Sequence, residues 1–291
     1  MKNRERWHAL GFISPALAGL SVFTALPVAL AVIMSLFDWP IFGDREFTGL
    51  GNYRTLLTES PDFWPALRNS ILFTVLYVPA NLTVALVLAL LLGPRLRGRA
   101  VFRVLFFIPV VTPMVANALV WKLVLQPEGL LNGLAGEWFG ITLPSFLADR
   151  NWAMIAIVVM SVWAGMGYNM LVLTAALEQL PTSVLEAARM DGAQGRHLLW
   201  RVTLPLISPA IFFAAVMTII GSLQVFAQPQ LLTGGGPGNS TIPLVMFIYD
   251  TGFKFQDLGL ASAAAWLLFV LIIGITALQF RAQRRWVHYE H

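Results

Sequence analysis

Residues 186–205 read EAARMDGAQGRHLLWRVTLP, a charged, glycine-containing stretch that interrupts two apolar runs. Ser183 lies three residues before Glu186, the first residue of this stretch, and this Ser-to-Glu spacing is that of a helix capping box. Gly192 permits a turn that a residue with a Cβ atom resists, and Pro205 marks the start of the next apolar run. The stretch therefore predicts a short helix, a glycine turn and a second helical run beside apolar segments.

The composition of the whole chain indicates a membrane protein. Its 291 residues are 57% hydrophobic and 12% charged, with a mean hydropathy of +0.72, whereas soluble domains carry about 25% charged residues. There is no cysteine and there are four histidines, so we expect neither disulfides nor an intrinsic metal centre. The excess of Lys and Arg over acids is typical of the bias that orients membrane proteins, and no nucleic-acid binding is expected.

Uncharged runs predict an all-α membrane protein, because a helix needs about 20 apolar residues to cross a bilayer core. We expect a single domain over residues 1–291 with six transmembrane helices. The expected spans are 9–37, 71–92, 104–121, 152–177, 204–227 and 259–280. Two functional loops lie between them, 178–205 and the Gly-rich loop 229–243. The first run resembles a signal peptide, but it is about twice as long as a signal h-region, which favours a retained span.

The distribution of charge predicts the orientation. Most of the 19 Lys and Arg, including Arg95 and Arg285, lie near the termini, in the loop before the third span and in loop 178–205. By the positive-inside rule, both termini and loop 178–205 are expected in the cytoplasm, with loop 229–243 outside. No charged side chain lies in the middle of an expected span. Since such charges usually mark ion or proton paths, their absence argues against a stand-alone secondary transporter.

Loop 178–205 has two open interpretations from its residues alone. It is either a docking element, whose small alanine side chains let another protein approach closely, or a plain connector between spans. A third interpretation, an enzyme that transfers phospho-alcohols, fits residues 191–196 superficially. Such enzymes hold a divalent metal with several carboxylates, but the next acid after Asp191 is Asp250, on the opposite side of the membrane. The enzymatic interpretation is therefore excluded.

The motifs of the chain resemble those of a known family. Glu-Ala-Ala at 186–188, Asp-Gly-Ala at 191–193 and Val-Thr-Leu-Pro at 202–205 resemble the EAA loop of the membrane permease subunits of binding-protein-dependent ABC importers. Residues 231–241, LLTGGGPGNST, resemble a segment of carbohydrate permeases of the maltose-F or glycerol-phosphate-A type. Residues 49–53 and 98–103 also fit this family, so that the resemblance covers nearly the whole chain.

The resemblance implies the type I ABC importer permease fold and a set of partners. These are a second homologous permease, two ATPase subunits that bind ATP and Mg²⁺, an extracytoplasmic solute-binding protein and a small carbohydrate. This subunit would hold no cofactor or metal and have no catalytic residue of its own. It also implies that an ATPase docks on the EAA loop, at Glu186, Ala187, Ala188, Asp191, Gly192, Ala193 and Pro205. The binding protein would face Gly234, Gly235, Gly236 and Pro237.

The substrate pathway is expected near the middle of the fourth and fifth spans. Trp163-Ala164-Gly165 aligns with a Trp-x-Gly motif of maltose-type permeases, and the matching positions are Ser161, Gly165, Tyr168, Thr218, Ser222 and Val225. The sequence alone adds the polar residues Asn169, Gln224 and Gln228. The sugar-binding asparagines of the family are largely absent from the matched positions, and Ser or Thr in spans also hold helices together.

We therefore expect an ATP-driven importer subunit in the cytoplasmic (inner) membrane of a bacterium or archaeon, taking up a sugar or sugar-like solute by alternating access. Import of glycerol 3-phosphate or a glycerophosphodiester is the alternative substrate class. The chain has no Walker A pattern, so it is not expected to be an ATPase or another enzyme.

Overall fold

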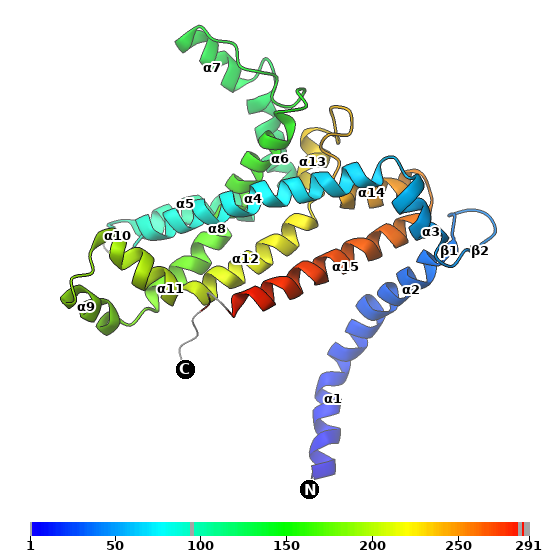
Figure 1. Ribbon diagram of the computed structural model, residues 1–291, viewed down its shortest axis with the longest axis horizontal. Helices are drawn as coiled ribbons and strands as arrows, with labels where there is room; N and C mark the ends of the chain where they lie inside the picture. Colours follow the sequence, from blue (N-terminus) through cyan, green and yellow to red (C-terminus); the bar gives the residue numbers. More distant parts are fainter. Residues whose placement is uncertain (1, 94–95, 285–286, 288–291) are drawn as a thin grey trace. The chain divides into compact units, whose positions relative to one another are not determined.

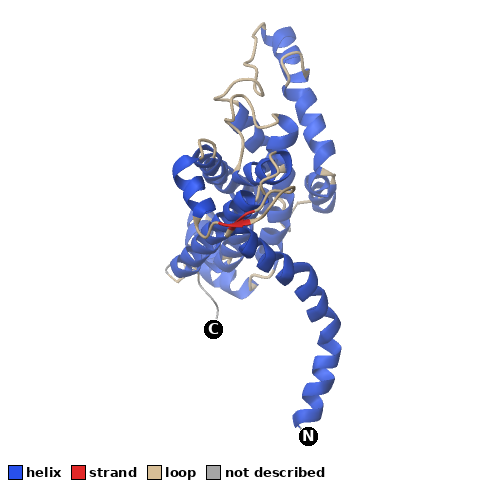
Figure 2. Ribbon diagram, turned by 90° about the vertical axis from the view of Figure 1, so that its right-hand side faces the viewer, coloured by secondary structure: helices blue, strands red, loops and turns tan. Residues whose placement is uncertain are grey.

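The computed structural model describes residues 2–93, 96–284 and 287, and Arg95 and Arg285 lie outside this part. Most described residues are helical (Figure 1, Figure 2). Their strands are β1 (Phe37–Asp38) and β2 (Glu46–Phe47), which pair antiparallel. The chain forms two compact units, Met1–Phe63 with Phe247–Val270, and Trp64–Met246 with Leu271–His291.

The first unit holds an apolar N-terminal helix and the beginning of the last helix. Its elements are α1 (Lys2–Leu20), a π-helical turn (Ser21–Ala25), α2 (Leu26–Ser35), α3 (Gly51–Arg54), a second π-helical turn (Thr55–Glu59), a third (Asp250–Lys254), and the start of α15 (Leu258–Gln283). Asn52 Nδ2 donates to the carbonyls of Ser35 and Phe37 at 3.0 and 2.7 Å. Asp257 Oδ1 accepts from the Leu260 N–H at 2.8 Å and caps α15, while burial raises the pKa of its carboxyl group.

The second unit contains the remaining helices. They are most of α4 (Phe63–Leu91), α5 (Arg99–Val111), α6 (Met114–Leu125), α7 (Leu130–Phe139), α8 (Ala153–Glu178), α9 (Thr182–Met190), α10 (Gly195–Leu198), a π-helical turn (Leu199–Thr203), α11 (Leu204–Leu206), α12 (Ser208–Leu223), α13 (Ala227–Leu232) and part of α14 (Leu244–Tyr249). In Figure 1, α9 and α13 lie toward opposite ends of α12.

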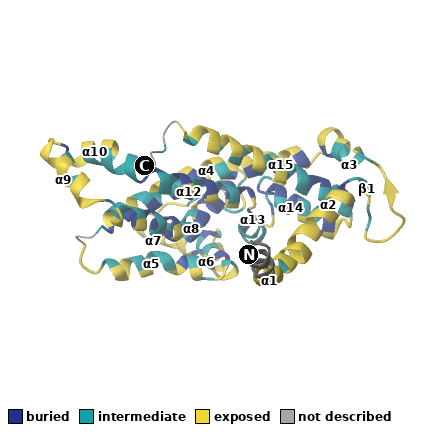
Figure 3. Cartoon of the chain, turned by 90° about the horizontal axis from the view of Figure 1, so that it is seen from below, coloured by how far each residue is buried: buried dark blue, intermediate teal, exposed yellow. Residues whose placement is uncertain are grey.

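Helix α8 is the centre of the second unit. Met170 and Leu173 of α8 are buried against Ala85 and Ala89 of α4. Gly167 lies so close to α5 that a Cβ atom would overlap the backbone carbonyl of Phe106. Figure 3 shows buried residues gathered along α8 and α12 and exposed residues along α9 and α10. The apolar contacts thus place α4, α5 and α12 around α8.

Among the described residues, four helices are long and apolar enough to cross a membrane. They are Gly11–Ser35, Phe63–Leu91, Ala153–Glu178 and Leu258–Gln283. Two bent pairs also pass, Arg99–Val111 with Met114–Phe139 at 97° and Gly195–Leu206 with Ser208–Leu223 at 67°. With each bent pair taken as one span, the described part has up to six candidate spans by length and composition.

The bend between α5 and α6 interrupts a run that the sequence presents as one span, 104–121. Thr112 precedes a proline and is extended, with φ −74° and ψ 133°, as expected for a residue before proline. Pro113 has no N–H to bond the carbonyl of Pro109. Asn117 replaces it, because its Nδ2 donates to the Pro109 carbonyl at 2.9 Å. One buried amide thus satisfies the backbone at the bend.

Candidate functional site

The stretch 186–205 forms the helix, turn and helix that its residues predict. Helix α9 ends at Met190, and Gly192 turns the chain with φ +88°, where a side chain is strained. The Ala193 N–H closes the turn by donating to the Ala188 carbonyl at 2.9 Å. The helix start differs from the capping-box prediction. Pro181, with φ −60°, occupies the N-cap position without a side-chain hydrogen bond, and Ser183 lies inside α9.

The residues predicted to dock an ATPase occupy different depths of this loop. Exposed positions are Glu186, Ala187, Asp191 and Gly192; Ala188 and Pro205 are half-buried, and Ala193 is buried. The exposed edge of α9 therefore presents two carboxylates beside a glycine turn. The buried alanine lets α9 and the segment after it pack closely.

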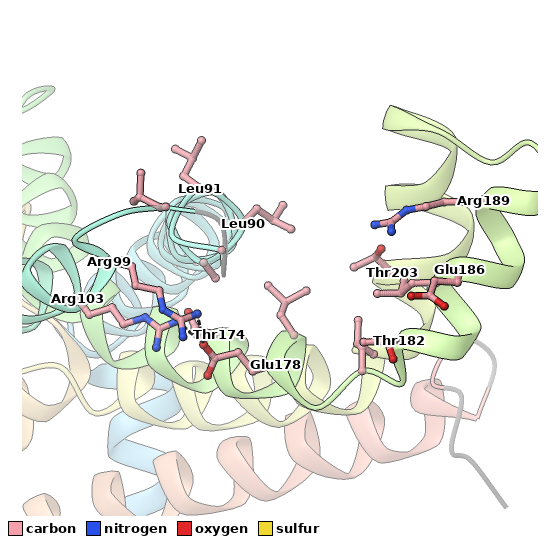
Figure 4. Close-up of a pocket in the computed structure, with 16 residues that line it drawn as sticks. Leu90, Leu91, Arg99, Arg103, Thr174, Glu178, Thr182, Glu186, Arg189 and Thr203 are labelled. Carbon is pink, nitrogen blue, oxygen red and sulfur yellow. Dashed lines mark hydrogen bonds and ion pairs between the residues drawn. The ribbon is translucent and has the colours of Figure 1, made fainter.

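A cavity of about 710 Å³ lies between α9 and the ends of α4, α5 and α8. Figure 4 shows Glu186 and Arg189 of α9 on one side and an ion-pair cluster on the other. In that cluster, Glu178 Oε1 accepts from Arg99 at 3.1 Å and from Arg103 at 2.6 Å. The two arginines thus tie the start of α5 to the end of α8.

A second cavity, of about 610 Å³, lies beside the middle of α8. Most of the predicted pathway residues line it: Gly165, Tyr168, Asn169, Thr218, Ser222, Gln224, Val225 and Gln228. Ser161 is not among the lining residues; it is buried on α8 and its hydroxyl has no hydrogen-bond partner in the described part of the chain. None of the described residues that line this cavity is charged. Its chemistry is that of amides, hydroxyls and aromatic rings.

Helix α4 contributes residues that the sequence reasoning missed. Phe73 and Tyr77 line the same cavity, and Tyr77 is the central residue of α4. Asn81, one turn further along, is fully buried, and its Nδ2 lies 3.3 Å from the Tyr77 hydroxyl. A tyrosine and an asparagine four residues apart share one helix face. Two polar residues on one face of an uncharged run are the sequence signal from which Tyr77 and Asn81 could have been predicted.

Three helices meet in hydrogen bonds at this cavity. Asn169 Nδ2 of α8 donates to Asn81 Oδ1 of α4 at 2.6 Å and to Thr218 Oγ1 of α12 at 2.9 Å. Ser222 Oγ lies 3.0 Å from the Thr74 hydroxyl of α4. In a membrane, such polar contacts hold helices together at about 0.6 kcal/mol each on average.

The Gly-rich loop is held firmly against the start of α4. Asn69 Nδ2 donates to the carbonyls of Asn239 and Ile242, both at 3.0 Å. Gly235 is buried with φ +90°, and Ile242 lies where a Cβ would be. Of the predicted contact residues, Gly234 is exposed, whereas Gly236 and Pro237 are half-buried. The loop is therefore anchored to α4, with Gly234 and Gly238 exposed.

Comparison with known proteins identifies the family. Residues 81–288 match the family described as binding-protein-dependent transport system inner membrane component. The lactose transport system permease protein of Rhizobium radiobacter is 34% identical over 94% of this chain and 93% of its own length. The sn-glycerol-3-phosphate transport system permease protein of Agrobacterium fabrum is 32% identical over 95% of this chain and 94% of its own length.

The fold also matches a solved transporter. A chain of a bacterial ABC transporter that imports the acidic polysaccharide alginate superposes with a TM-score of 0.85 over 98% of both chains, at 23% identity. A bacterial alginate ABC transporter in complex with an alginate pentasaccharide-bound periplasmic protein gives a TM-score of 0.81, over 98% of this chain and 96% of that one, at 22% identity. These structural matches confirm the all-α permease fold. The chain belongs to the family of inner membrane components of binding-protein-dependent transport systems, the permease subunits of ABC importers.

Proposed function

We propose that this permease carries a neutral sugar or polyol through the 610 Å³ cavity beside α8. The observation that supports this most is the absence of charge among the described residues that line the cavity. Hydroxyl groups of a sugar need neutral donors and acceptors, and Asn169, Thr218 and Ser222 provide such groups. The similarity to a lactose permease supports the same substrate class.

Glycerol 3-phosphate is the second candidate, because a permease for it is 32% identical to this chain. A phosphate is bound best by charge-assisted hydrogen bonds from Arg or Lys. The described cavity residues offer none, so this candidate requires the second permease to supply the positive charge. The two candidates therefore differ in which subunit binds the substrate.

The exposed edge of α9 is the proposed docking surface for an ATPase. Glu186 and Asp191 offer carboxylates to a basic surface, and Gly192 shapes the turn between them and α10. Two ATPase subunits, which bind ATP and Mg²⁺, would move this permease and a second one between inward-facing and outward-facing states as rigid bodies. Gly234 lies on the external face proposed to contact the solute-binding protein. The whole complex is proposed to reside in the cytoplasmic membrane of a bacterium or archaeon.

The proposed pathway is tested by filling the cavity without disturbing its walls. Gly221 lines the cavity and a Cβ there meets nothing within 4 Å, so Gly221→Leu places new atoms in open space. In proteoliposomes with the partner permease, ATPase subunits and binding protein, we expect uptake to be lost while the complex still assembles. Gly274→Leu is the matched control, since Gly274 also has open space and does not line the cavity.

The substrate class is tested with the binding protein of the system. Calorimetry against lactose, maltose, raffinose, sorbitol and sn-glycerol 3-phosphate should detect binding of a neutral compound. Binding of sn-glycerol 3-phosphate alone, or wild-type uptake by Gly221→Leu, would contradict the proposal.

A further inference from the structure

Tyr77 is the aromatic residue at the middle of α4 that lines the cavity. Its ring stacks on that of Phe73, with centroids 5.2 Å apart and an interplanar angle of 11°. The ring is thereby held from one side, and its hydroxyl is held by Asn81 Nδ2 at 3.3 Å. A phenol fixed at both ends is a rigid feature of the cavity wall.

The direction of the hydrogen bonds that reach Tyr77 follows from a backbone carbonyl. Thr218 Oγ1 lies 2.6 Å from the Ala214 carbonyl, which only accepts, so the single Thr218 proton is used there. The Thr218 oxygen must therefore accept from Asn169, and the Asn169 atom that faces it at 2.9 Å must be Nδ2.

The same nitrogen also faces Asn81. Asn169 Nδ2 carries a second hydrogen, which goes to Asn81 Oδ1 at 2.6 Å. The other end of the Asn81 amide is then Nδ2, which donates to the Tyr77 oxygen. Each bond in the series fixes the next one. The series therefore makes the Tyr77 oxygen an acceptor from within the protein.

Because the Tyr77 oxygen accepts the hydrogen bond from Asn81, the hydroxyl hydrogen of Tyr77 is left to be donated to another partner. A phenol donates one hydrogen bond, and no acceptor within the described part of the chain takes the one from Tyr77. Gly165, which also lines the cavity, borders the hydroxyl: a Cβ at Gly165 would lie 2.5 Å from the Tyr77 oxygen and 3.2 Å from Asn81 Nδ2. The glycine leaves room for the phenol at the cavity wall.

We infer that Tyr77 is a specificity-determining residue, whose hydroxyl donates a hydrogen bond to an oxygen of a neutral hydroxylated substrate. Asn81 and Asn169 are positioning residues, because Thr218 orients the Asn169 amide, Asn169 orients Asn81, and Asn81 donates to the Tyr77 oxygen. This inference rests on the proposed function of the cavity. It assigns to α4 a part of the binding site that the fourth and fifth spans do not supply.

Binding to the purified permease–ATPase complex, without binding protein, tests the role of Tyr77. The probe is whichever of tritiated lactose, maltose, raffinose or sorbitol the wild-type complex binds most tightly. Tyr77→Phe removes only the hydroxyl, and we expect the Kd to rise about fivefold to tenfold, as for the loss of one neutral hydrogen bond. Tyr53→Phe is the matched control, because its hydroxyl donates to Ser35 and it does not line the cavity.

A double-mutant cycle tests the positioning role of Asn81. Asn81→Leu removes the bond that orients the phenol, so it should raise the Kd in the wild type but add nothing in the Tyr77→Phe background. Additive effects on the Kd would show that Asn81 acts independently of the Tyr77 hydroxyl, which would refute its positioning role. Thermal stability and co-purification of the ATPase subunits report folding and assembly of each complex, so that a change in Kd in a folded, assembled complex is assigned to binding.

The outcomes separate this inference from the proposed function. If Gly221→Leu abolishes binding while Tyr77→Phe leaves the Kd unchanged, the cavity remains the binding site and the role of Tyr77 is refuted. If Gly221→Leu also leaves binding unchanged, or no neutral probe binds, the proposed function itself fails and the inference fails with it.

Discussion

Gly165 shows how a single missing methyl group shapes the cavity beside α8. The α4 phenol occupies the space that a side chain at this α8 position would need. Glycine in a helix interior costs roughly 0.5–1 kcal/mol relative to alanine, so the position sacrifices helix stability for a close approach. The benefit is a hydroxyl group placed at the middle of two long helices.

Gly165→Ala should impair substrate binding without preventing folding. The new Cβ displaces the Tyr77 hydroxyl, because 2.5 Å is closer than real Cβ contacts allow. We expect a higher Kd for the same neutral probe, while the ATPase subunits still assemble with the variant. Gly274→Ala, the same change in α15 with nothing within 4 Å, should bind as the wild type does. Equal affinities for the two variants would contradict the close approach.

The residues of the cavity were partly predictable from the sequence. Thr218 and Ser222 lie four residues apart on one helix face, and both line the cavity. Ser161 is a serine like Ser222, but it does not line the cavity. Asn81 and Tyr77 were not predicted, because their role arises from contacts with Asn169 and Gly165, far away in sequence. Helical spacing reveals a shared face, but not which helix that face meets.

At the scale of elements, the apolar runs indicated the helices, but not where they bend. Pro15, Pro79 and Pro109 lie inside helices, whereas Pro113 follows the end of α5. A proline removes the same N–H in each case. Proline alone therefore does not decide whether a helix ends. At the α5–α6 bend the donor that replaces this N–H is Asn117, whose role is visible only in three dimensions.

The α9 helix is proposed to transmit ATPase movement, and a charge reversal on its exposed edge tests this. Glu186→Lys should weaken assembly with the ATPase subunits and lower ATP-driven uptake, since the variant repels a basic docking surface. Co-purification of the ATPase with the permease measures assembly. Glu137→Lys, the same reversal on an exposed residue of α7, is the control and should assemble normally. Normal assembly of both variants would remove Glu186 from the docking surface.

At the scale of the whole molecule, the absence of cysteine allows the orientation to be measured directly. Met190→Cys places a thiol on α9, where Met190 is 88% exposed, and Glu137→Cys places one on exposed α7. The positive-inside rule puts these positions on opposite sides. A membrane-impermeant maleimide should label Met190→Cys only in inside-out vesicles and Glu137→Cys only in right-side-out vesicles. Labelling of both from one side would overturn the predicted topology.

The directed hydrogen bonds from Thr218 to Tyr77 have a consequence for how such a permease can evolve. The donor state of the phenol depends on residues of α12, α8 and α4 together, so the effect of changing one depends on the others. A valine at 218 frees the Asn169 amide to rotate, and a substitution at 77 then acts in a different chemical background. Substrate preference in this lineage should therefore change through coordinated replacements on three helices, with strong epistasis between sites that are distant in sequence.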